Sequence, residues 1–288
     1  MSERLGVNKT YKLYVGGAFP RSESGRSYPV LGASGDFLAH AAAGSRKDVR
    51  DAVVAARAAF RGWAGATAYN RGQVLYRVAE MMEGRRAQFG DEVARAEGLS
   101  AADALVLVDE AVDRWVWYAG WTDKLAQVLG SANPVAGPYL NLSTPEPSGV
   151  VGVLAPPESS LLGLVSVLAP VLAAGNTAVV LASETRPLPA VTLAEVLATS
   201  DVPGGVVNVI TGRVAETAPR LASHADVDGL DLTGAPEELA TALEVAAADN
   251  LKRVLRRPDT QPDWSAEPGL GRLRAFLETK TVWHPIGV

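Results

Sequence analysis

Short apolar strands alternate with helix-like segments in the second half of the chain, and this alternation constrains the fold most. The strands are continuous runs of aliphatic residues, which is typical of strands buried on both faces. Strands that alternate with helices form parallel βαβ units. We therefore predict an α/β fold with a doubly wound, Rossmann-like parallel sheet. The expected strands are Val150–Leu154, Asn176–Leu181, Val206–Ile210, Val227–Leu232 and Leu251–Leu255, with helices at Leu161–Ala173, Ala190–Ala198 and Glu237–Ala248.

The first half of the chain predicts a small β element followed by helices. Tyr11–Pro20 alternates apolar and polar residues around a Gly-Gly turn and predicts a hairpin. Ser, Gly and Pro are frequent in Arg21–Gly44, which predicts short strands and loops. Ser45 is a candidate N-cap with Asp48 as its capping-box partner. Further helices are expected at Asn70–Glu97 and Ser100–Leu129, and the aromatic cluster of the latter is expected to pack in the core.

The residue counts exclude several kinds of site. The 288 residues contain no cysteine, which rules out disulfides, thiolate metal sites and a Cys nucleophile from this chain. A formal net charge of -5 argues against nucleic-acid or anionic-membrane partners. His40, His224 and His284 lie far apart without metal-ligand spacing, so no metal site is expected.

No targeting or membrane segment is expected. Met1–Thr10 is polar and lacks the apolar core of a signal peptide. The longest apolar stretch, Leu161–Ala174, is too short for a bilayer and contains Gly163 and Pro170. We therefore expect a cytoplasmic protein.

The carboxyl ends of parallel strands are where an open α/β sheet binds ligands. Leu232–Ala235 (LTGA) stands at a strand end before a helix, where backbone N–H groups attract anions, although Thr-Gly is also an ordinary turn. Glu158-Ser159-Ser160 follows the first strand and could hold a nucleophilic serine. No Gly-x-Ser-x-Gly elbow and no placed histidine supports that reading, so a hydrolase is not expected.

Four segments resemble the NAD(P)-dependent aldehyde dehydrogenase family. Three of them match its cofactor-binding domain: residues 149–156 (GVVGVLAP), 169–184 (APVLAAGNTAVVLASE) and 203–212 (PGGVVNVITG). The fourth, residues 276–287 (FLETKTVWHPIG), resembles the family's C-terminal strand. The resemblance extends more loosely over 11–255 and 274–287. The chain is also similar to the degenerate second unit of long, two-unit aldehyde dehydrogenases.

The resemblance implies a degraded nucleotide site. The family pattern Phe-Thr-Gly-Ser, followed shortly by another Gly, keeps only Thr233 and Gly234 here, with Leu239 at the second glycine position. The family's Lys-Pro-Ser-Glu keeps Glu184, but the lysine position is Leu181. Glu184 is either a residual ribose contact or a solvated loop carboxylate. We expect no or weak NAD(P) binding, with Glu184, Thr233 and Gly234 as the remaining cofactor-binding residues.

The resemblance also implies that the catalytic residues are lost. Glu158 stands at the position of the family's oxyanion Asn, where a carboxylate would repel a developing negative charge. The general-base motif that should follow Asn250-Leu251-Lys252 is replaced by Arg253–Pro258. The thiol-bearing domain expected beyond it is absent. No catalytic residue is therefore predicted, and the chain alone should not oxidise aldehydes.

The family's oligomerisation strands are retained by resemblance, at Pro138–Val150 and Phe276–Pro285. Arg274–His284 is expected to be one extended edge strand. The organisation is then 1–130, an N-terminal hairpin and helical part; 131–149 and 272–288, oligomerisation strands; 150–258, the Rossmann-like part; and 259–271, a linker replacing the catalytic domain. The candidate oligomerisation residues are Tyr139, Leu140, Phe276, Thr279, Val282 and Trp283.

Loss of catalytic parts with retention of assembly strands leads to one hypothesis of function. The chain is a pseudoenzyme that forms a hetero-oligomer with a full-length aldehyde dehydrogenase and stabilises or regulates it. The alternative is an NAD(P)-dependent oxidoreductase that is active only when a partner supplies the catalytic Cys. A third possibility is a fragment without function. Deleting residues 274–288 is expected to abolish partner binding and to leave the α/β domain folded.

Overall fold

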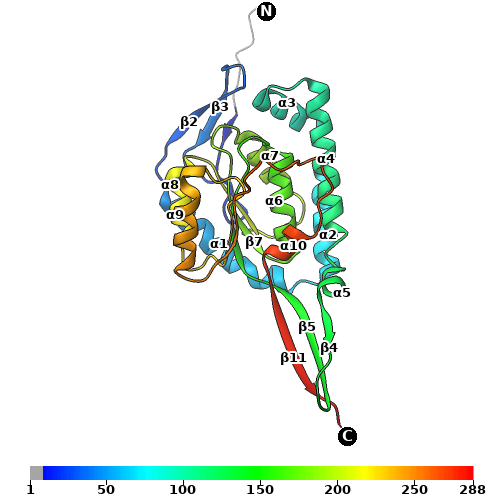
Figure 1. Cartoon of the computed structure of the whole chain (residues 1–288). Coiled ribbons are helices and arrows are strands. Elements are labelled where there is room, and N and C mark those ends of the chain that lie inside the picture. The colour runs from blue at the N-terminus through cyan, green and yellow to red at the C-terminus, as the bar shows by residue number, and fades with distance from the viewer. Residues whose placement is uncertain (1–8, 288) are drawn as a thin grey trace, which may run out of the picture.

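A five-stranded parallel sheet with helices on both faces forms the body of the molecule, and a narrow β arm projects from it (Figure 1). This computed structural model describes residues 9–287. Most of the Met1–Thr10 segment, on which the signal-peptide expectation rests, lies outside the described residues. Among residues 9–287, no helix combines the length and the apolar character that crossing a bilayer requires.

The central sheet confirms the predicted doubly wound α/β fold. Its strand order is β10-β9-β6-β7-β8, and every pairing in it is parallel. All residues of β6, β7 and β8 are buried, because helices cover both faces. The strands are β6 (Val150–Leu154), β7 (Thr177–Leu181), β8 (Val207–Ile210), β9 (Gly229–Asp231) and β10 (Arg253–Leu255).

Successive side chains of each strand enter different cores. Val151 and Val153 of β6 pack on the side of the wholly buried helix α6, whereas Val150 and Leu154 pack on the side of α1 and α8. This period-2 alternation is the geometry of a pleated strand buried on both faces. The flanking helices are α6 (Leu162–Ala173), α7 (Leu188–Leu197), α8 (Val214–Ala222) and α9 (Glu237–Ala248).

Helix α8 is a correction, because no helix was predicted between β8 and β9. It has only nine residues and contains Pro219, which normally ends a helix. Its amphipathic pattern nevertheless buries Ala218, Leu221 and Ala222 against α1 and the sheet. Tertiary packing therefore overrides the local signal.

The predicted capping box of the first helix is confirmed. The Ser45 hydroxyl accepts from the Asp48 N–H at 3.3 Å, and the Asp48 carboxylate accepts from the Ser45 N–H at 2.8 Å.

The two longer predicted helices are each broken, at Gly84 and at Gly120, which end α2 and α4. The observed helices are α1 (Arg46–Gly65), α2 (Ala68–Glu83), α3 (Arg86–Glu97), α4 (Ala101–Ala119) and α5 (Leu125–Leu129). Trp115 and Tyr118 of α4 are buried in the core, as expected of this aromatic cluster.

The predicted N-terminal hairpin is present, and the Leu13 N–H donates to the Pro20 carbonyl at 3.2 Å. Val15 and Ala18 exchange backbone hydrogen bonds around Gly16-Gly17, whose positive φ angles suit glycine. Tyr14 then pairs with Val209 of the central sheet, so this segment does not form an isolated hairpin. The expected short strands that follow are present. The strands of this small sheet are β1 (Thr10–Tyr11), β2 (Ser27–Leu31) and β3 (Phe37–Ala42), in the order β1-β3-β2.

The arm is a three-stranded antiparallel sheet in the order β11-β5-β4 (Figure 1). Nine residue pairs join β5 to β11, from Leu277↔Pro147 to Pro285↔Tyr139. Its strands are β4 (Ser131–Asn133), β5 (Tyr139–Pro147) and β11 (Leu277–Pro285). The expected strand start at Arg274 is wrong, because Gly271–Ala275 forms the short helix α10, whose Leu273 is fully buried.

The base of the arm belongs to the body. Phe276 is 2% exposed and lies in the main core, where its ring packs against Gly229 of β9. The Phe276 carbonyl accepts from the fully buried Asn176 side chain at 3.0 Å. Deletion of residues 274–288 would therefore remove the buried Phe276 and Leu277 from the core. The expectation that this deletion leaves the α/β domain intact is corrected accordingly. A truncation that spares the body must begin after Leu277.

Candidate functional site at the carboxyl edge of the sheet

A cleft of about 380 Å³ lies at the carboxyl edge of the central sheet. The loops after β6, β7 and β9 form its walls, together with Arg257 and Gln261 of the segment that leads to the arm. This is the position at which open parallel sheets bind ligands. Glu184, Thr233 and Gly234, predicted from the sequence, all line this one cleft.

Thr233 is held in place by the carboxylate of Asp231. Its N–H donates to the Asp231 carboxylate at 2.9 Å, and its hydroxyl donates to the same oxygen. Gly234 packs against β6, and a Cβ there would collide with the carbonyl oxygen of Ala155. The glycine is thus required by the close approach of two backbone segments, with or without a ligand.

Glu184 has a role that the sequence did not indicate. Its carboxylate accepts a hydrogen bond at 3.1 Å from the N–H of Val214, the first residue of α8. The N-cap residue, Arg213, makes no side-chain cap bond. Glu184 therefore satisfies a free donor at the helix start, and its negative charge suits that end of the helix dipole. Glu184 thus caps the start of α8, a role distinct from the ribose contact and the solvated loop carboxylate expected from the sequence.

Carboxylates outnumber the single cation, Arg257, among the charged residues that line this cleft. Three carboxylates line it, two of them in ion pairs: Glu158 with Arg186 at 3.4 Å and Glu237 with Arg257 at 3.6 Å. Glu237 and Glu238 occupy the first turn of α9, where the free N–H groups would otherwise attract an anion. Carboxylates at this place repel a pyrophosphate.

The two leucines that replace family residues lie in the core. Leu181 ends β7 and is buried, and Leu239 packs partly buried beside the same apolar cluster. Neither can offer a hydrogen bond or a charge to a nucleotide. Leu181 thus supplies no charge where the family pattern has a lysine.

The hydroxyls after β6 are used in structural contacts. Ser159 Oγ accepts from the Gly163 N–H at 2.8 Å. The N–H and hydroxyl of Ser160 donate to the Glu97 carboxylate at 2.7 and 2.6 Å. The carbonyl of Glu158 accepts from Arg186 at 2.6 Å. These contacts bind the loop to α3, to the start of α6 and to the β7 loop, and no histidine takes part in them.

The segment that follows β10 covers part of this edge, which the sequence did not predict. Its Trp264 ring lies against Gly163 of α6, and its backbone carbonyls at Trp264 and Ala266 accept from Arg114 of α4. The Arg272 guanidinium lies 5.3 Å from the centroid of the Trp264 ring. The segment is thereby attached to the face of the body that α4 and α6 form.

Arg272 also forms a buried ion pair with Asp231 at 2.8 Å and donates to the Thr233 hydroxyl at 3.0 Å. Asp231 is 1% exposed. Burial raises the pKa of Asp231, and the Arg272 charge and the Thr233 hydrogen bonds oppose that shift. Both residues are charged in sequence, but only the fold shows that residues 41 positions apart meet.

The fold and the position of the cleft define a Rossmann-like α/β domain with a cleft at the carboxyl edge of its sheet. The sequence model of the aldehyde dehydrogenase family matches residues 21–256. The chain belongs to the aldehyde dehydrogenase family.

Curated relatives and solved structures agree with that assignment. The chain is 34% identical over 251 residues to the mitochondrial benzaldehyde dehydrogenase of Antirrhinum majus, covering 84% of this chain and 46% of the relative. It is 32% identical over 264 residues to the cytosolic 10-formyltetrahydrofolate dehydrogenase of Mus musculus, covering 88% of this chain and 28% of the relative. The chain thus spans about half the length of these relatives, or less.

Two solved structures share the fold closely. HpcC from Thermus thermophilus matches with a TM-score of 0.81 at 31% identity, over 85% of this chain and 47% of that one. The NAD+ complex of an aldehyde dehydrogenase from Bacillus cereus matches with a TM-score of 0.81 at 28% identity, over 85% of this chain and 50% of that one.

Proposed function

We propose that this chain is a non-catalytic aldehyde dehydrogenase-like subunit that binds a full-length aldehyde dehydrogenase and stabilises or regulates it. The arm carries this proposal. It projects from the body, and within residues 9–287 no strand pairs with the outer edge of β11 (Figure 1). An unpaired strand edge is a template for pairing with another chain.

Exposed apolar side chains on both faces of the arm support an interface there. Val282 of β11 stands directly opposite Leu142 of β5, and both are exposed. Tyr139 and Trp283 form an exposed edge-to-face aromatic pair with ring centroids 5.7 Å apart. Clustered aromatic and aliphatic side chains of this kind favour a covered surface. Leu140 and Thr279 are exposed along the same strands, whereas the buried Phe276 serves this chain's own core.

The cleft supports the non-catalytic part of the proposal. The 288 residues contain no cysteine, and the hydroxyls after β6 are engaged in structural contacts. We also infer that NAD(P) binding is weak or absent, because Glu158, Glu184 and Glu237 all line the carboxyl-edge cleft and would repel a pyrophosphate there. A cytoplasmic location remains our prediction.

The assembly test is co-expression with a full-length aldehyde dehydrogenase of the same host, followed by affinity purification and light scattering. The full chain should form a complex, and deletion of residues 278–288 should abolish it without loss of the body fold. Val282→Glu should weaken the complex at least about tenfold by placing a charge in an apolar interface. Val245→Glu is the matched control, because Val245 is exposed on α9, away from the arm.

Unchanged affinity after the 278–288 deletion would exclude pairing through the arm. Equal loss in Val282→Glu and Val245→Glu would show that the effect is not specific to the arm. Calorimetry with NAD and NADP tests the cofactor inference separately. A low-micromolar dissociation constant would contradict it and favour an oxidoreductase that acts only with a partner's thiol.

A further inference from the structure

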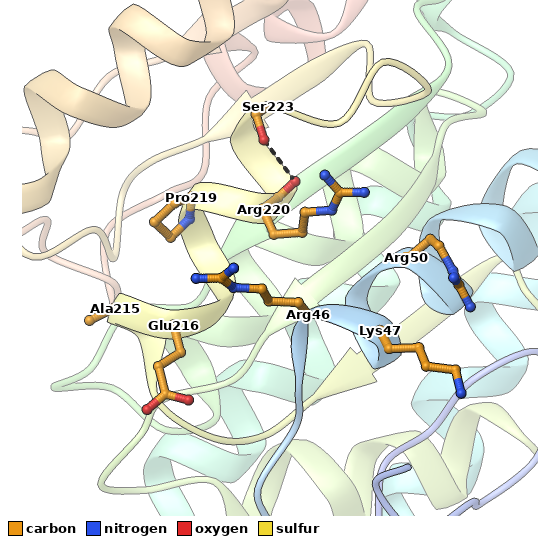
Figure 2. A pocket seen from close by; sticks show the side chains of 8 residues that line it. All are labelled: Arg46, Lys47, Arg50, Ala215, Glu216, Pro219, Arg220 and Ser223. Carbon is orange, nitrogen blue, oxygen red and sulfur yellow. Dashed lines mark hydrogen bonds between the residues drawn. The ribbon is translucent and has the colours of Figure 1, made fainter. Parts of the chain in front are cut away.

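A second cleft, of about 540 Å³, lies between the start of α1 and the outer side of α8 (Figure 2). It is separate from the carboxyl-edge cleft and shares no lining residue with it. Its volume is in the range of small-ligand sites. Its charged lining residues are Arg46, Lys47, Arg50, Glu216 and Arg220.

Four cations face one carboxylate in this cleft, although the chain as a whole has a net charge of -5. Lys47 lies 3.7 Å from Glu23, and Arg50 lies 2.7 Å from Asp51. The carboxylate of Glu216 lies 3.7 Å from Arg213, which does not line the cleft. Arg46 and Arg220 are the two cations of the cleft that these pairs do not include.

Arg46 and Arg220 make no ion pair with any residue in the part of the chain that the structure describes. Figure 2 shows that Arg46 extends from α1 toward α8 and that Arg220 extends from α8 toward α1. Both side chains are exposed to solvent. Two unpaired guanidinium groups from different helices therefore lie beside one opening.

The stability of α1 does not explain its basic start. Arg46 and Lys47 are its first two residues, at the positive end of the helix dipole, where acidic side chains are favoured. Arg220, by contrast, lies in the last turn of α8, where a cation suits the dipole. The dipole of α1 adds to the positive potential of the cationic side chains in the cleft. Both the dipole and these side chains would therefore stabilise a bound anion.

We propose that this cleft binds a small phosphorylated anion of the pyrophosphate or phosphomonoester class. Guanidinium groups match phosphate oxygens with paired, charge-assisted hydrogen bonds, and the cleft size suits a phosphorylated metabolite rather than a polymer. Arg46 and Arg220 provide the principal contacts. Lys47 and Arg50 add positive potential. The site is independent of the arm and of the function proposed above.

The test is calorimetric titration of the full chain with inorganic pyrophosphate at low ionic strength, with sulfate as a comparison anion. Saturable binding at one site per chain is expected, and it should weaken as salt is added. The double variant Arg46→Gln/Arg220→Gln should bind at least about tenfold more weakly, since each lost charge-assisted contact contributes about that factor. Its thermal midpoint should change little, because losing Arg46 favours the start of α1 while losing Arg220 disfavours the end of α8.

The matched control is Arg61→Gln/Arg77→Gln, which removes the same charge from exposed positions on α1 and α2 outside the cleft. Its affinity for pyrophosphate should stay within about twofold of the unaltered chain. No saturable binding, or equal weakening in both double variants, would overturn the proposal. Tight binding of a single-stranded oligonucleotide that pyrophosphate does not displace would overturn it too, in favour of a polymer surface.

Discussion

Polar groups that could face a ligand at the carboxyl edge are held by neighbours in the same chain. Ser160 is bound to Glu97, Thr233 to Asp231, and Glu184 caps α8. A buried or shared donor that is already satisfied gains little from a new partner and loses its old one. At the scale of single residues, these polar groups are therefore engaged in structural contacts within the chain.

The first prediction at this scale concerns activity. The purified chain should produce no NADH or NADPH from any aldehyde, because it has no thiol to attack the carbonyl. Absorbance of the reduced nicotinamide with micromolar protein, after removal of contaminating dehydrogenases, measures this. Turnover that follows the chain through purification would contradict it.

The second residue-scale prediction concerns Gly234. Gly234→Ala should lower the free energy of unfolding by about 1–3 kcal/mol, because the new methyl group meets the Ala155 carbonyl. Gly62→Ala in α1 is the control, since nothing lies within 4 Å of its Cβ position, and it should stabilise by about 0.5–1 kcal/mol. Urea unfolding of both variants gives the comparison. A stable Gly234→Ala protein would show that the glycine is not required for packing.

At the scale of elements, β11 consists of a buried first residue, which belongs to the core of the body, and an exposed remainder. Leu277 is largely buried and the rest of the strand is exposed. Arg253 of β10 holds Glu278 in a two-point ion pair, one contact of which is 2.6 Å, and this lowers the pKa of Glu278. Its contribution is present above the ordinary glutamate pKa of about 4.3 and is lost as the pH falls through the lowered value. Strand β11 is thus attached to the body at its base and exposed to solvent along the rest of its length.

The element-scale prediction separates these parts. Phe276→Ala should lower the free energy of unfolding by about 3–5 kcal/mol, since it leaves a cavity beneath β9. Trp283→Ala, at a side chain that is 58% exposed, should change it by no more than about 0.5 kcal/mol. Denaturant titrations of the two variants measure the difference. Equal effects would mean that the ends of the arm share one role.

At the scale of the whole molecule, the segment between β10 and β11 attaches to the α4–α6 face of the body and to the edge of the sheet. It contacts α4 through Arg114, α6 through Trp264 and the edge of the sheet through Arg272. Residues 256–276 therefore complete the fold between the Rossmann-like part and the arm. Arg257 and Gln261 of this segment also line the carboxyl-edge cleft.

The whole-molecule prediction concerns this attachment. Arg272→Leu should lower the free energy of unfolding by about 3–5 kcal/mol at neutral pH, because the Asp231 carboxylate is left buried and unpaired. The loss should shrink as the pH falls through the raised pKa of Asp231, since the protonated acid carries no charge. Arg256→Leu, at an exposed arginine paired with Glu244, should cost less than about 1 kcal/mol. A pH-independent loss in Arg272→Leu would exclude an unpaired carboxylate as the cause.

The sequence by itself determined the features that depend on neighbours along the chain. The period of apolar residues set β6 and α9 at their observed bounds, and Ser45 with Asp48 set the start of α1. These signals are local, since a strand period, a helix period and a capping box each involve only a few consecutive residues. The family also followed from sequence, because its motifs are continuous segments.

Only the tertiary structure decided the features that join distant residues. The capping of α8 by Glu184, the pairing of Asp231 with Arg272 and the burial of Phe276 each depend on where the fold brings remote segments together. Helices α8 and α10 form because their apolar residues find a core, despite Pro219 in one and only five residues in the other. Packing free energy from long-range contacts outweighs weak local propensity in these places, and the amphipathic pattern of α8 is the one local signal that favours its helix.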